Sequence, residues 1–133
     1  MLDLMDAAVT AVFRKLSQRA ELTALTPVAE HVTQDSPWPM TRIGGAESVP
    51  IGGKSAQLEE ISVQVDTLYR GESPAEARAI MHQQRLALEG QAIEHQGVEF
   101  DRPEWAGAVI DGPAKDGLTY VGVQTFIIKA EPA

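Results

Sequence analysis

Residues 60–77 read EISVQVDTLYRGESPAEA, and this stretch decides the fold because it joins a strand pattern directly to a helix start. Apolar and polar residues alternate over 61–69, which predicts a strand with one buried face and one face toward water or a partner. The strand can extend from Leu58 to Arg70. Thirteen residues at about 3.3 Å each span roughly 43 Å, which is long for a small domain.

The second half of the stretch predicts a helix over residues 73–89. Ser73 is the expected N-cap, Pro74 takes the first helical position, and Glu76 completes an S-x-x-E capping box. Gly90 is the expected C-terminal stop. The face that helical spacing turns toward the core carries Ala77, Ile80, Met81, Gln84 and Leu88.

The flanking sequence supplies another helix and further strands. Apolar residues recur at three- and four-residue spacing over 2–20, which predicts an amphipathic helix. Strands are expected at 28–32 and 40–43, and then at 98–110, broken by proline and glycine, and at 118–130. A hairpin-length connection makes the last two antiparallel. The expected fold is α+β, a single antiparallel or mixed β-sheet with two helices packed on one face.

The segment 44–56 contains four glycines and Pro50, and it predicts a flexible loop or a hairpin arm. Loops of this length in compact domains are usually functional or disordered. A loose loop and an exposed sheet face can both become ordered against a partner. The candidate contact residues are Gly44, Gly45, Glu47, Lys54, Ser62, Gln64 and Asp66.

Length and composition limit the classes of function. The 133 residues predict one domain, 1–133, and the 44% of apolar residues are enough for a folded core. The net charge of −8 argues against a wide phosphate-binding face, and the absence of cysteine excludes disulfides and thiolate chemistry. Asp3 and Asp6 stand where a signal peptide would be basic, and no apolar run is long enough to span a bilayer. We expect a soluble cytoplasmic product.

The chemical motifs of enzymes are missing. The three histidines, His31, His82 and His95, lack the spacing of metal ligands. Residues 52–55 read GGKS, but a phosphate-binding loop would need glycine at position 48, which is Ser48, and a helix directly afterwards. We therefore expect no enzymatic activity and no catalytic, metal-binding or cofactor-binding residues.

The order of these features resembles the tail terminator (tail completion, neck) proteins of long-tailed bacteriophages and gene transfer agents. The likeness is carried by an extended segment, PWPMTRIG at 37–44, by the long strand at 60–70, and by SPAEA at 73–77. It continues to the last strand, which begins DGLTY at 116–120. The resemblance covers residues 5–130, which is most of the chain.

The resemblance implies a structural virion protein of the tail or neck, assembled in the host cytoplasm. It would form a ring, usually a hexamer, between the tail-tube protein and the head–tail connector or stopper protein. DNA would pass through the lumen without specific binding, and no membrane or cofactor would be involved. Two alternatives stay open: a head-side connector or stopper of the same neck, and a small enzyme or ligand-binding module.

Overall fold

The computed structural model describes residues 1–30, 36, 38–53 and 56–133. The expected α+β fold is confirmed, with one short additional helix. In chain order the elements are α1 (Leu4–Ser17), α2 (Ala20–Thr23), β1 (Val28–Ala29), β2 (Met40–Pro50), β3 (Glu59–Arg70), α3 (Pro74–Leu88), β4 (Val98–Phe100), β5 (Glu104–Asp111) and β6 (Thr119–Pro132). Residues 31–32 of the strand expected at 28–32 lie outside the described residues.

The sheet is mixed and has the strand order β1-β2-β3-β6, after which β4 and β5 share the far edge of β6. The β1–β2 pair is parallel, and the other pairs are antiparallel. The β3–β6 ladder is unbroken from Glu59 opposite Ala130 to Arg70 opposite Thr119. The strand expected at 98–110 is divided into β4 and β5, with Pro103 lying in the break. Proline fits there because it cannot donate to a ladder hydrogen bond.

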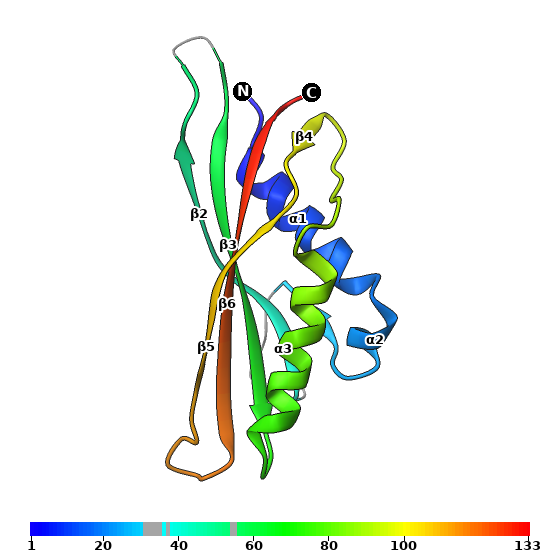
Figure 1. Cartoon of the computed structure of the whole chain (residues 1–133), viewed down its shortest axis with the longest axis vertical. Coiled ribbons are helices and arrows are strands. Elements are labelled where there is room, and N and C mark those ends of the chain that lie inside the picture. Colours follow the sequence, from blue (N-terminus) through cyan, green and yellow to red (C-terminus); the bar gives the residue numbers. More distant parts are fainter. Residues whose placement is uncertain (31–35, 37, 54–55) are drawn as a thin grey trace.

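The core lies between the helices and one face of the sheet. Helices α1 and α3 lie on the same side of the sheet (Figure 1). The alternation predicted for β3 is confirmed over 61–65, where Ile61, Val63 and Val65 are fully buried in one cluster with side chains of α1 and α3. Over 66–69 the side chains on both faces are buried. Burying one such side chain contributes about 1.5–3 kcal/mol. The opposite face of the sheet has no helix over it in the part of the chain that the structure describes (Figure 1).

The start of α3 follows the predicted signals, with one difference. Ser73 is the N-cap, and its hydroxyl accepts a hydrogen bond from the Ala75 N–H at 3.2 Å. The Glu76 carboxylate accepts a hydrogen bond from the Tyr69 hydroxyl at 2.6 Å. Glu76 therefore does not complete the predicted capping box. Its hydrogen bond to Tyr69 instead joins α3 to the end of β3. Gly90, with φ of 69°, follows the C-cap and stops the helix as expected.

The Tyr69–Glu76 hydrogen bond changes the titration of the tyrosine. Tyr69 is only 4% exposed. The hydrogen bond to the carboxylate, aided by burial and by the negative charge of Glu76, raises the pKa of Tyr69 from 10.0 to about 12. Because the folded chain holds this proton more tightly than the unfolded chain, the contribution to stability is complete below pH 10 and is lost as the pH rises through about 12.

We expect Tyr69→Phe to remove this pH dependence. Two pKa units correspond to about 2–3 kcal/mol, so the stability advantage of the wild type should shrink by up to that amount between pH 10 and about 12. Urea unfolding of both proteins at a series of pH values measures the difference. Tyr120→Phe is the control for general alkaline effects. A constant difference across this range would contradict the assigned hydrogen bond.

The segment expected as a flexible loop at 44–56 is mostly a hairpin arm. Residues 44–50 belong to β2 and pair with β3, from Ala46 opposite Val63 to Pro50 opposite Glu59. The register shifts between Ile43 and Ala46, so the two adjacent glycines form a β-bulge. Of the remainder, residues 54–55 lie outside the described residues. The hairpin alternative is therefore correct for 44–50, because pairing with the long β3 overrides glycine flexibility.

A polar network lies inside the core beneath α3. Gln84 and Gln124 are 0% and 2% exposed and bond to each other, from Gln124 Nε2 to Gln84 Oε1 at 2.8 Å. Gln84 Nε2 donates to the hydroxyls of Thr41 on β2 and Thr67 on β3, at 2.9 and 2.8 Å. Gln124 accepts from Trp105 Nε1 at 3.1 Å and donates to the Met81 carbonyl at 2.7 Å. The network joins α3 to strands β2, β3, β5 and β6.

Candidate contact surface

The helix-free face of the sheet carries the candidate contact residues of β3. Side chains alternate along a strand, so Ser62, Gln64 and Asp66 lie opposite the buried Ile61 and Val63. Glu47 pairs with Ser62 across the β2–β3 ladder and shares its face. The structure thus brings residues of the bulge region and of the long strand onto one surface.

Four of the seven candidates line one shallow hollow on this face. The hollow has a volume of about 370 Å³. Its lining residues are Gly45, Ala46, Glu47, Ser62, Gln64 and Thr125. Thr125 was not among the candidates, and it arrives because it lies opposite Gln64 in the β3–β6 ladder. The alternation of the last strand could have placed Thr125 on this face, but the sequence contains no signal for the register of that strand against β3.

Asp66 does not belong to the exposed part of this surface. It is 3% exposed, and its Oδ2 accepts hydrogen bonds from Arg42 Nη2 at 2.8 Å and Arg42 Nε at 3.1 Å. Its Oδ1 accepts a further hydrogen bond from Gln64 Nε2 at 2.8 Å. The expectation of an exposed contact residue is therefore wrong in this respect, because Arg42 on the neighbouring strand covers the carboxylate.

Gly44 lies directly against this ion pair. A Cβ at position 44 would come within 2.7 Å of Asp66 Oδ2 and 2.9 Å of Gln64 Nε2. The absence of a side chain at Gly44 thus leaves room for the Arg42–Asp66 pair to close over the bulge. Gly45, in contrast, has open space around it and borders the hollow. The seventh candidate, Lys54, lies outside the described residues.

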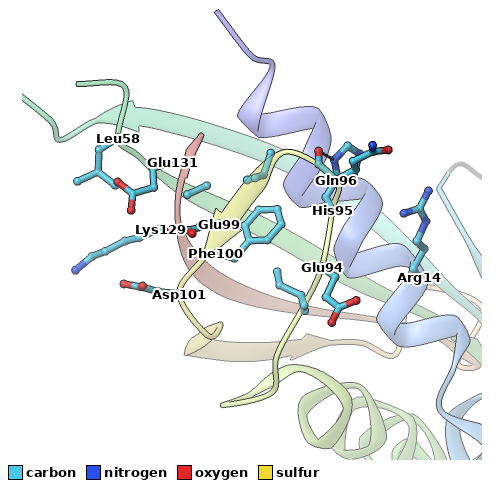
Figure 2. A pocket seen from close by; sticks show the side chains of 13 residues that line it. Arg14, Leu58, Glu94, His95, Gln96, Glu99, Phe100, Asp101, Lys129 and Glu131 are labelled. Carbon is cyan, nitrogen blue, oxygen red and sulfur yellow. Dashed lines mark hydrogen bonds between the residues drawn. The ribbon is translucent and has the colours of Figure 1, made fainter. Parts of the chain in front are cut away.

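A second hollow, of about 810 Å³, lies near the chain termini, where β4 meets the end of β6 (Figure 2). Glu99 pairs directly with Glu131 across the β4–β6 ladder. Like charges at such a position repel each other, and Lys129 on β6 borders the same hollow. Asp101 and Glu94 add to the acidic rim shown in Figure 2. The lining thus holds four carboxylates against two basic side chains, Arg14 and Lys129, and is net acidic.

The two described histidines lie on different elements. His82 lies on α3 and His95 borders the hollow near the termini, while His31 lies outside the described residues. Among the described residues, no group of three or more histidine, aspartate or glutamate side chains is placed to hold a metal ion. Over the same residues, no helix is long and apolar enough to cross a membrane.

Exposed apolar side chains occur on both long hairpins. Val49 and Ile51, at the end of the β2 arm, are 48% and 42% exposed. Val109 on β5 and Leu118 before β6 are 60% and 40% exposed. The two hairpins extend from opposite ends of the sheet (Figure 1). Single exposed apolar side chains are common on protein surfaces, so these four show that apolar surface is accessible at the hairpins but do not by themselves define an interface.

The fold is similar to that of known virion components. A chain from the structure described as the virion of a native gene transfer agent particle matches with a TM-score of 0.85 and 18% identity, over 98% of this chain and 99% of that chain. The structure of the bacteriophage SPP1 gp17 protein matches with a TM-score of 0.63 and 22% identity, over 98% of this chain and 91% of that chain. No curated protein matches the sequence.

The fold is therefore one that occurs in a chain of a gene transfer agent virion and in a bacteriophage protein. The family model of tail completion protein gp17 matches residues 10–131, and the chain belongs to this family. By family it is a tail completion protein. The resemblance drawn from the sequence is confirmed.

Proposed function

We propose that this protein forms a closed ring of six copies that caps the finished tail tube and joins it to the head-side connector, with DNA passing through the centre. The observation that carries the proposal is the family match over residues 10–131. The helix-free sheet face and the two protruding hairpins supply surfaces for neighbours in such an assembly. The whole chain, 1–133, acts as one repeated domain.

The charge of the chain supports passage of DNA without binding. Each copy carries a net charge of −8, and a ring multiplies this value by the number of its copies. Nucleic-acid affinity comes largely from lysine and arginine that neutralise phosphates, so an acidic ring lets DNA slide. The hollow near the termini, where four acidic side chains outnumber Arg14 and Lys129, is the surface that we assign to this role.

Deletion of the gene from the genome that encodes the particle tests the proposal. We expect unjoined heads and tails or overlong tail tubes in electron micrographs, with infectivity or gene transfer reduced at least about a hundredfold. A plasmid copy of the gene should restore joined particles. Normal particles from the deletion strain would contradict the proposed function. The position of the protein along the particle axis, seen by cryo-microscopy, distinguishes a tail cap from a head-side connector or stopper.

A further inference from the structure

The β2–β3 arm presents an apolar strip between acidic side chains. Val49 lies opposite Glu60 in the ladder, and Glu47 is two residues away on the same strand, so the three side chains share the helix-free face. Val49 is 48% exposed, and Ile51 continues the strip at 42%. Within the described part of the chain, neither glutamate has a side-chain hydrogen bond or an ion pair, although Lys129 is the ladder partner of Glu60.

A groove lies between α3 and β5, and its apolar wall and basic rim complement the apolar and acidic side chains of the arm. It has a volume of about 240 Å³, and its apolar wall includes Met81, Trp105 and Val109. Val109 borders the groove at the outer edge of β5, where it is 60% exposed, and its ladder partner Val123 places its side chain toward the helix-free side of the strand. The groove also lies beside a free sheet edge, because β5 pairs only with β6 among the described strands. Such an edge can accept another extended segment.

The rim of the groove is basic. Arg78, His82 and Arg85 follow one another at helical spacing along α3 and all border the groove. Arg85 is already engaged, since its guanidinium lies 3.6 Å from the centre of the Trp105 ring and its Nε is 2.7 Å from Glu89 Oε2. Arg78 and His82 have no ion pair or side-chain hydrogen bond within the described residues. Arg78 is thus available to an acidic partner.

We propose that the β2–β3 arm of one copy docks into the α3–β5 groove of the next copy, with Val49 against Val109 and the arm glutamates toward Arg78. Within one chain the two surfaces cannot meet, because β3 and β6 separate β2 from β5 in the sheet. A contact between two different surfaces is heterologous, and repetition of such a contact closes a ring when its rotation permits. The inference rests on the proposed ring and names the contact that builds it.

The chain contains no cysteine, so introduced thiols report this contact without background. In a Val49→Cys and Val109→Cys double variant, a short thiol-to-thiol crosslinker should produce a ladder of covalent oligomers that ends at the closed ring. A mixture of the two single variants should stop at dimers, and each single variant alone should remain uncrosslinked. The matched control pairs Val49→Cys with Leu86→Cys, which is 42% exposed on α3 but does not border the groove.

The reaction is carried out on concentrated purified protein and on purified particles that contain the variants. Equal crosslinking in the control pair, or an intact oligomer without a ladder from the double variant, would overturn the arm-to-groove contact. An intact oligomer without a crosslinked ladder would still be compatible with the proposed function, provided that the variant gene restores joined particles. Normal particles from the deletion strain would instead defeat the proposed function, whatever the crosslinking shows.

Charge reversal provides an independent readout of the same contact. Arg78→Glu should weaken self-association about tenfold, measured by sedimentation, and Glu60→Arg in the same chain should restore most of it. Lys115→Glu makes the same charge change in the β5–β6 turn, away from the groove, and should have little effect. If Arg78→Glu and Lys115→Glu weakened self-association equally, the effect would be one of general charge, and the proposed pairing would be overturned.

Discussion

Replacement of Gln84 with leucine is expected to lower the free energy of unfolding by about 3 kcal/mol. The glutamine is fully buried, donates to the hydroxyls of Thr41 and Thr67, and accepts from Gln124. Leucine fills a similar volume but removes all three hydrogen bonds. Thr41 keeps its bond to Thr26 and Gln124 keeps its bond to the Met81 carbonyl, whereas the buried Thr67 hydroxyl loses its partner. A buried polar group left unsatisfied costs about 1–3 kcal/mol, and each lost hydrogen bond adds about 0.5–1.5 kcal/mol. Urea unfolding followed by circular dichroism measures the loss.

Gln83→Leu is the matched control, because it makes the same change at the adjacent position. Gln83 is only half-buried, and its Oε1 accepts one hydrogen bond from Arg19 Nε at 2.8 Å. We expect a cost below about 1 kcal/mol there, since water can replace this bond. Equal losses in the two variants would mean that the buried network adds nothing beyond an ordinary helix position. If the double variant Gln84→Leu/Gln124→Leu loses less stability than the sum of the two single losses, the two glutamines are coupled.

The burial of Gln84 could be predicted from sequence, but its partners could not. Helical spacing over 73–89 already assigns Gln84 to the core-facing side of α3. Its hydrogen bonds reach residues 43, 17 and 40 positions away in sequence. Such contacts depend on the order and register of three strands, and local periodicity contains no information about either.

The same distinction explains the results for the contact surface. Alternation over 61–69 correctly separates the two faces of β3, and it places Asp66 with Ser62 and Gln64. Alternation does not report what the neighbouring strand adds to a face. Arg42 buries Asp66 from β2, whereas Thr125 joins the hollow from β6. Glycine content at 44–56 likewise left a flexible loop and a hairpin arm both open, and pairing with β3 forms a strand through residue 50.

Removal of the Arg42 guanidinium should also destabilise the fold strongly. Arg42→Met keeps the apolar stem of the side chain but leaves the Asp66 carboxylate, whose side chain is 4% exposed, without its cation. Breaking a buried pair in this way typically costs 3–5 kcal/mol. The arginine side chain is itself 34% exposed, so water partly compensates, and we expect a loss of about 2–3 kcal/mol in urea unfolding.

A double variant shows whether the unpaired charge causes this loss. With Asp66→Asn added to Arg42→Met, no charge remains to be buried, and the new amide can still accept from Gln64; at least half of the stability should therefore return. Glu89→Gln is the control for an ion pair of similar length, 2.7 Å between Arg85 and Glu89, with side chains 40% and 42% exposed. It should cost less than about 1 kcal/mol, because water screens that pair. If the double variant were no more stable than Arg42→Met alone, the arginine would act through packing over the Gly44 bulge, and the ion pair would not be what holds β2 to β3 at this point.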